Sequence, residues 1–295
     1  MQVVKKRNFY YLVHSYRQDG ITKNYQVYIG KEAPNQDQIE NFAKNYIKQR
    51  WHNQIEYINQ VYRKNIEKTS KTINEKNLRA FGVSFTHNTN KIEGSTLSRT
   101  DTRMILEDGI VPANSHVTDV FETKAHMKIY LQAMSYKQFL SLDLILKWHY
   151  ELFRETKPDQ AGSIRNSAVF ISGSKYIPPK SRYEIDLLLN ELFDWYQKGI
   201  TNNVDPVYIA AVFHFRFVSI HPFEDGNGRI TRLIMNYILY HNNCMMFDLN
   251  PKERKTYYNA LERSNLKNDE IYFLGWFYPK YIQNTSKTLK QLNFI

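Results

Sequence analysis

The sequence predicts a mainly α protein with a small β-hairpin at its amino terminus and one short β-hairpin between the helices. Apolar residues recur at helical spacing over most of the chain after residue 37. Alternating Tyr- and Val-rich stretches are confined to the first 30 residues and to residues 168–177. The chain has 295 residues, of which 42% are hydrophobic and 23% charged, so it is expected to fold around a sizeable core.

The individual elements follow from local signals. Residues 8–16 and 24–29 are expected to pair as a hairpin around a turn at Gln18–Gly20. Helices are expected at residues 37–68, 73–92, 98–109, 117–135, 141–155, 183–198, 205–220, 230–241, 251–264 and 270–292. Residues 205–220 are apolar almost all round, so this helix should be central. The expected domains are a hairpin unit (1–34), a helical segment (35–110) and a core (111–295).

Composition excludes several classes of protein. Cys244 is the single cysteine, so neither an internal disulfide nor a Cys-rich zinc site can form. No run approaches the roughly 18 apolar residues of a membrane span, and no secretory signal precedes the first strand, so a cytoplasmic protein without membrane contact is expected. The net charge of +11 favours a polyanionic partner. Because the basic residues are spread along the chain, nucleic acid is disfavoured as that partner.

The segment from His221 to Arg232 carries features of a phosphate site. Gly226 and Gly228 permit positive φ and close approach of the backbone to a ligand. Successive N–H groups there, with the positive end of the following helix, would form an anion hole. Arg229 and Arg232 are three residues apart and share a helix face, which suits a di- or triphosphate.

The same segment carries the groups for a reaction at phosphorus. Asp225 supplies a carboxylate suited to hold Mg²⁺ together with phosphate oxygens. The His221 imidazole could accept a hydroxyl proton near neutral pH. These groups suit the transfer of a phosphorus group to an alcohol, whereas a P-loop, a His-Glu-x-x-His motif and a Gly-x-Ser-x-Gly motif are absent from the sequence.

Residues 221–232, His-Pro-Phe-Glu-Asp-Gly-Asn-Gly-Arg-Ile-Thr-Arg, match the Fic signature H-P-F-x-[DE]-G-N-G-R-x-x-R at every fixed position. The chain therefore resembles the Fic family. The resemblance implies an all-helical Fic core with the signature between two central helices. It also implies adenylylation (AMPylation), in which AMP passes from ATP, with Mg²⁺, to a Ser, Thr or Tyr hydroxyl of a target protein or of the enzyme itself.

The resemblance assigns a role to each residue of the signature. His221 would be the general base, and Asp225 would bind Mg²⁺ at the α- and β-phosphates. The residues that would hold or neutralise the phosphates are Gly226, Asn227, Gly228, Arg229 and Arg232. The Asn227 side chain would assist the glycine backbone in this.

Two further segments resemble the family more loosely. Residues 168–177 take the place of the family's flap, which aligns a target by strand addition, with Val169, Phe170 and Ile171 as its target-binding residues. Gly162–Arg165 is similar to the lead-in to that flap. Tyr257, Tyr258 and Asn265 resemble residues on the adenine and ribose side. Two adjacent tyrosines on a helix are equally consistent with core packing.

Upstream of the signature, Thr89-Asn90-Lys91-Ile92-Glu93-Gly94 fits the family's inhibitory pattern [ST]-x-x-x-E-[GN], as in class II members. The resemblance implies an inhibitory helix at about residues 84–94, whose Glu93 would pair with Arg232 and so occupy the guanidinium that the γ-phosphate needs. The alternative is an ordinary helix end at Gly94 with an exposed Glu93.

Two other functions remain open at this point. In one, Glu93 orients a water and the protein removes AMP from a modified target. In the other, the basic surface binds nucleotide or nucleic acid without turnover. A homodimer that positions the inhibitory helix is also considered, and the sequence does not specify the target.

Overall fold

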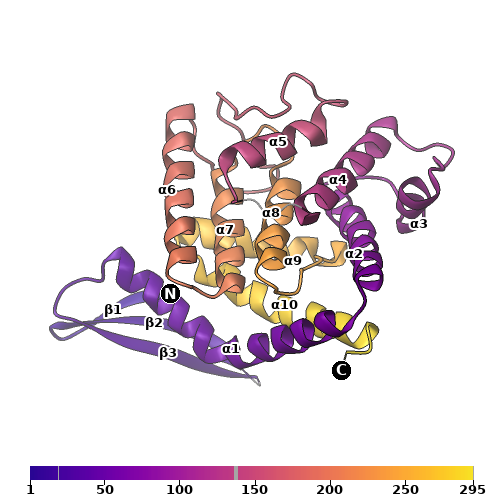
Figure 1. Cartoon of the computed structure of the whole chain (residues 1–295). Coiled ribbons are helices and arrows are strands. Elements are labelled where there is room, and N and C mark those ends of the chain that lie inside the picture. The colour runs from indigo at the N-terminus through magenta and orange to yellow at the C-terminus, as the bar shows by residue number, and fades with distance from the viewer. Residues whose placement is uncertain (19, 136–138, 295) are drawn as a thin grey trace.

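The computed structural model describes residues 1–18, 20–135 and 139–294. They form a helical body with one antiparallel sheet at its side, which confirms the predicted fold class (Figure 1). The strands are β1 (Gln2–Lys6), β2 (Phe9–Gln18) and β3 (Ile21–Gly30). The helices are α1 (Gln36–Lys68), α2 (Lys71–Ile92), α3 (Arg99–Arg103), η1 (Met104–Asp108), α4 (Val117–Ser135), α5 (Leu142–Phe153), α6 (Arg182–Thr201), α7 (Pro206–Ile220), α8 (Asn227–His241), η2 (Pro251–Glu253), α9 (Arg254–Lys267) and α10 (Ile271–Gln291).

The sheet has the order β1-β2-β3, with both pairs antiparallel. The predicted hairpin is β2-β3, in which Leu12 lies opposite Val27; its predicted turn includes Asp19, which lies outside the described residues. Strand β1 was not predicted, because it is short, lies at the sheet edge and presents Lys5 and Lys6 to solvent. Its pairing with β2 turns the expected hairpin into a three-stranded sheet.

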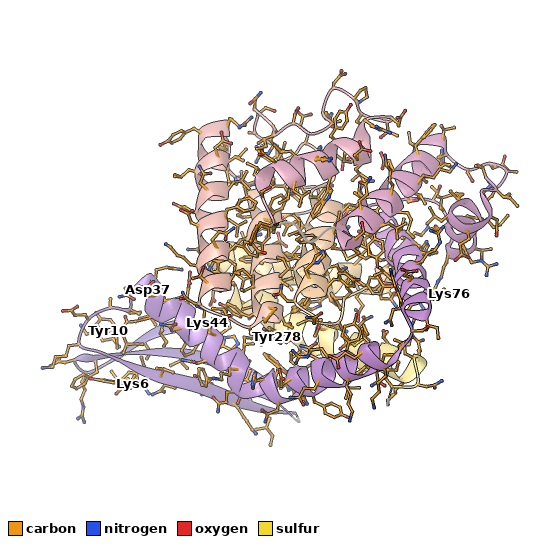
Figure 2. The ribbon with its side chains drawn as sticks, in the orientation of Figure 1. Lys6, Tyr10, Asp37, Lys44, Lys76 and Tyr278 are labelled. Atoms are coloured by element: carbon orange, nitrogen blue, oxygen red, sulfur yellow. The ribbon has the colours of Figure 1, made fainter. Side chains whose placement is uncertain are left out.

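Helix α1 connects the sheet to the helical body. Its start is fixed by a capping box in which Asn35 accepts a hydrogen bond from the N–H of Gln38, at 2.9 Å. Tyr46 packs against the inner face of the sheet. Further along, Trp51 stacks on Tyr278 of α10 with ring centroids 5.4 Å apart, and Figure 2 shows Tyr278 beside α1.

The core is built around α7 and α8, which lie side by side with α6 and α10 against them (Figure 1). Asp205 caps α7 by accepting a hydrogen bond from the Val207 N–H at 2.8 Å, and Pro206 occupies the first turn. Most of α7 is buried, as its apolar sequence predicts. The loop between α7 and α8 therefore joins two helices that are mostly buried.

Helix α2 packs against α4 and α8 and carries the predicted inhibitory segment at its carboxyl end. Asp248, in the segment after α8, accepts hydrogen bonds from Ser84 Oγ at 2.7 Å and Asn88 Nδ2 at 2.8 Å. The two donors are four residues apart on one face of α2, so a single carboxylate holds that face to the core. The helix ends at Ile92 with Glu93 as its C-cap, and Gly94 follows with φ +105°.

Residues 168–177 do not form the predicted strand ladder. They run as a loop with one turn, in which Ser174 N–H donates to the Ile171 carbonyl at 3.0 Å. The physical reason is that the tip is held by a side chain instead: Glu262 of α9 accepts hydrogen bonds from Lys175 N–H and Ser174 Oγ. This segment is called the flap loop below.

No helix of the described residues is long and apolar enough to cross a membrane. The predicted domain boundaries at residues 34 and 110 stay a prediction.

Candidate active site

The loop between α7 and α8 is held by its own side chains. Phe223 is fully buried and stacks on His149, with ring centroids 3.8 Å apart. The Asn227 amide brackets the Phe223 backbone: Oδ1 accepts from its N–H at 2.9 Å and Nδ2 donates to its carbonyl at 2.8 Å. The Asn227 side chain therefore helps to close the loop, and its role in holding phosphate stays a prediction.

The start of α8 has the features of an anion site. Gly226 adopts φ +78°, and a Cβ there would collide with the Phe153 ring, so only glycine fits the bend. The N–H groups of the first turn, from Asn227 to Arg229, have no acceptor within the helix. The positive end of the helix dipole adds to their attraction for an anion.

His221 ends α7 with a left-handed backbone, φ +52°. Its Nδ1 lies 3.2 Å from the Val218 carbonyl, so we assign the proton to Nδ1, which leaves Nε2 as the proton acceptor. Burial lowers the pKa of the imidazole, and the hydrogen bond to Val218 only partly offsets this. The ring is therefore neutral at pH 7, the state that a general base requires.

Arg165 fixes both the base of the flap loop and the backbone of His221. Its Nε donates to the His221 carbonyl at 2.7 Å, Nη1 to the Ser167 carbonyl at 2.6 Å and Nη2 to the Pro179 carbonyl at 2.7 Å. The guanidinium is buried and closes the segment between Ser167 and Pro179 into a loop. The sequence marked Arg165 as part of a lead-in to the flap but gave it no role.

The predicted contact between Glu93 and Arg232 is present. Glu93 Oε1 lies 2.6 Å from Arg232 Nη2, and Arg232 also donates to Thr89, through Nε to Oγ1 at 2.7 Å and through Nη2 to the carbonyl at 3.2 Å. The Arg232 side chain is 1% exposed and that of Glu93 27%. Burial alone would lower the pKa of Arg232, but the charge and hydrogen bond of Glu93, together with Tyr257 and Tyr258, outweigh it and raise that pKa.

Glycine is required next to this pair. A Cβ at Gly228 would collide with the carboxylate of Glu93, so the glutamate can approach the start of α8 only because position 228 has no side chain. The carboxylate thus lies at the place where the anion site begins.

A second set of charges lies on the other side of the loop. Arg229 Nη1 forms an ion pair with Glu122 of α4, and its Nη2 is 3.7 Å from Asp225 Oδ1. Lys157 Nζ forms an ion pair with Asp225 and lies 3.9 Å from Glu122 Oε1. Nothing in the sequence singled out Glu122 or Lys157, because each is far along the chain from its partner.

Asp225 is the candidate metal ligand. Burial would raise the pKa of its carboxyl, but the charges of Arg229 and Lys157 outweigh burial and lower that pKa. Among the residues that the structure describes, no cluster of three or more His, Cys, Asp or Glu could hold a metal ion. A single ionised carboxylate fits Mg²⁺ only where phosphate oxygens and waters complete the coordination, as is usual for this ion.

An open cavity of 460 Å³ lies in front of this loop. It is lined by Lys157, Gln160, Ser167, Val169, Glu224 and Asp225, so it joins the flap loop to the signature. Of the predicted flap residues, Val169 faces this cavity and Phe170 is 83% exposed, while Ile171 is half-buried.

The three residues predicted on the adenine and ribose side have different surroundings. The Tyr257 hydroxyl lies 2.8 Å from His214 Nε2, and its ring packs on Phe273 within the core. This burial favours the core-packing alternative for Tyr257, and its assignment to nucleotide binding stays a prediction. Tyr258 is partly exposed; burial raises the pKa of its hydroxyl, and the charge of Glu93 adds to this while that of Arg232 opposes it, so Tyr258 lies near this ion pair. The Asn265 side chain accepts a hydrogen bond at 2.7 Å from Ser219 Oγ of α7, two residues before His221 in the chain.

Comparisons with known proteins agree with this geometry. Residues 139–239 match the model of the Fic/DOC family. This match is to about a third of the chain. The family match covers α5 to α7 and most of α8 and so includes the whole signature, while Glu93, at the end of α2, lies before it.

Curated relatives are similar in sequence to part of this chain. Protein adenylyltransferase fic-1 of Caenorhabditis elegans is 32% identical over 187 residues, which cover 62% of this chain and 36% of the relative. Protein adenylyltransferase Fic of Aedes aegypti is 31% identical over 179 residues, covering 59% of this chain and 35% of the relative. The chain thus spans about a third of the length of the curated relatives that it matches.

Solved structures confirm the fold. Fic-1 of C. elegans superposes with a TM-score of 0.72 at 22% identity, covering 87% of this chain and 84% of that one. A Fic domain containing signaling protein of Bacteroides thetaiotaomicron has a TM-score of 0.70 at 24% identity, covering 79% of this chain and 94% of that one.

Proposed function

We propose that this protein is an adenylyltransferase that transfers AMP from ATP to a hydroxyl group of a protein, and that Glu93 holds it inactive. The observation that carries the proposal is the placement of His221 on the same short loop as the glycine-rich start of α8. Curated relatives with the name protein adenylyltransferase support it.

The chemistry follows from the groups around the loop. A nucleotide phosphate would bind the N–H groups at the start of α8, and Asp225 would hold Mg²⁺, which would neutralise charge on the phosphates. His221 Nε2 takes the proton of a Ser, Thr or Tyr hydroxyl as its oxygen attacks the α-phosphorus. A bond from that oxygen to phosphorus forms, the bond from phosphorus to the β-bridging oxygen breaks, and pyrophosphate leaves.

Inhibition follows from competition for one guanidinium. Arg232 cannot pair with both Glu93 and a phosphate, since the carboxylate lies at the start of α8 where the phosphate would bind. Removing one partner of a fully buried ion pair costs about 3–5 kcal/mol. Because Glu93 is 27% exposed, we expect a smaller cost of about 2–3 kcal/mol, which still amounts to roughly 30- to 150-fold in an equilibrium.

The transfer is tested with ATP radiolabelled at either the α- or the γ-phosphate, using wild type, Glu93→Gly and Glu93→Gly/His221→Ala. The proposal expects α-label on protein with Glu93→Gly, little with wild type, and none with the double variant. Incorporation of γ-label would mean kinase chemistry and would reject the proposal. Equal labelling with and without His221 would reject its role as base.

The reverse reaction, removal of AMP with Glu93 orienting water, stays a prediction. It is separated from transfer by incubating a pre-adenylylated protein with wild type and with Glu93→Gly, because only the reverse reaction needs the glutamate. Self-modification, a homodimer and a cytoplasmic location also stay predictions.

A further inference from the structure

Four charged side chains form a closed ring beside the signature loop. Glu122 contacts both cations: it pairs with Arg229, and its Oε1 lies 3.9 Å from Lys157 Nζ. Asp225 also contacts both, since it pairs with Lys157 and lies 3.7 Å from Arg229. The ring therefore contains two carboxylates and two cations, and its charges balance without any ligand.

The two cations of the ring differ in what they can reach. The Arg229 side chain is 5% exposed, and its guanidinium lies 4.8 Å from the centre of the Phe153 ring. This encloses the arginine between Phe153 and the two carboxylates. The Lys157 side chain is 36% exposed and lines the 460 Å³ cavity. Of these two, only the lysine can turn to a ligand without disturbing the core.

The contact of Lys157 with Asp225 is one that a bound nucleotide would break. A carboxylate that takes Mg²⁺ must give up the ammonium group now lying against it, because the two cations repel each other. The lysine stem has four rotatable carbons, and Glu122 lies close enough to limit how far the ammonium group can move. The phosphate chain would lie in the same cavity, within reach of that group.

We propose that Lys157 is a further phosphate-binding residue of this site, whose ammonium group turns from Asp225 to the phosphates of the bound nucleotide, with Glu122 positioning it. The proposal rests on the proposed function for the identity of the nucleotide. Arg229 then acts mainly by holding Asp225 and Glu122 in place, and Lys157 supplies the mobile positive charge on that side.

The test is equilibrium binding, which needs no turnover. Calorimetry with Mg²⁺ would measure α,β-methylene-ATP, whose reacting bond cannot be cleaved, and adenosine, which has no phosphates. The protein carries Glu93→Gly throughout, so that Glu93 does not compete. Lys157→Met should weaken binding of the ATP analogue about tenfold, as for a lost charged hydrogen bond, and leave adenosine unchanged. Lys157→Arg should retain most of the affinity.

The matched control is Lys128→Met. Lys128 also forms an ion pair with a glutamate, Glu151 at 2.7 Å, but does not line the cavity. Loss with Lys157→Met that does not exceed this control, or an equal loss for adenosine and the ATP analogue, would overturn the inference. If Lys157 governs analogue binding but no AMP is transferred, the inference stands and the proposed function fails. If AMP is transferred but neither transfer nor analogue binding depends on Lys157, the proposed function stands and the inference fails.

Discussion

Replacing Glu93 with Gln isolates the charge of the ion pair with Arg232. Glutamine keeps the size of the side chain beside Gly228 and an oxygen that can accept a hydrogen bond, but it leaves a guanidinium that is 1% exposed without an opposing charge at position 93. An uncompensated buried charge of this kind costs about 3–5 kcal/mol, and the 27% exposure of Glu93 reduces the expected loss to about 2–3 kcal/mol. For a chain of 295 residues this lowers Tm by roughly 3–5 °C.

The assay is thermal unfolding with and without α,β-methylene-ATP and Mg²⁺. Because the phosphates would supply the missing negative charge to Arg232, the analogue should raise the Tm of Glu93→Gln by more than it raises that of wild type. The control is Glu75→Gln, which removes an exposed pair with Lys71 on the same helix and should cost less than about 1 kcal/mol.

Two results would refute this reasoning. A Glu93→Gln protein as stable as Glu75→Gln would mean that the pair does not stabilise the resting state. An equal shift by the analogue in Glu93→Gln and wild type would mean that Glu93 and the phosphates do not compete for Arg232.

Three further substitutions test the surroundings of the site. In Arg165→Lys the charge is kept, but a lysine cannot donate to all three carbonyls that Arg165 contacts. AMP transfer should therefore fall more than tenfold, while the affinity for the analogue in calorimetry stays within twofold. Equal losses of transfer and affinity would contradict a positioning role. Burial raises the pKa of Asp248 from 3.8 to about 6, so the folded protein binds a proton at this carboxyl more tightly than the unfolded chain does. The resulting contribution to the free energy of unfolding is complete below about pH 4 and is lost as the pH rises through about 6. Urea unfolding should therefore show wild type losing about 1 kcal/mol relative to Asp248→Asn between pH 5 and 7.5, whereas parallel profiles would contradict this. Gly226→Ala should lose about 2–4 kcal/mol in urea unfolding because its Cβ meets Phe153 at positive φ, while Gly275→Ala, with open space around it, should be neutral or stabilising; similar values for the two would contradict the strain at Gly226.

The parts of the site that the sequence predicted are those encoded in one continuous stretch. His221, Asp225 and the glycines lie within a few residues of each other, so their spacing alone places them on one loop. The helices were predicted for a similar reason, since apolar periodicity and local caps such as Asn35 and Asp205 determine where they begin.

The contacts that the sequence did not predict join distant segments. Glu122 meets Arg229 across 107 positions and Lys157 meets Asp225 across 68, so no local pattern marks either pair. The single long-range contact that was predicted, Glu93 with Arg232, followed from family resemblance rather than from spacing. The sequence did not separate the two readings of Tyr257, because a tyrosine on a helix has the same sequence pattern in a core as in a binding site.

The central claim is that His221 transfers AMP at a site held inactive by Glu93. The most direct test is the intact mass of purified wild type, Glu93→Gly and Glu93→Gly/His221→Ala after incubation with ATP and Mg²⁺. We predict a gain of one or more AMP groups in Glu93→Gly, little or none in wild type and none in the double variant. The same mass for all three proteins, or a gain equal to a phosphate, would contradict the account.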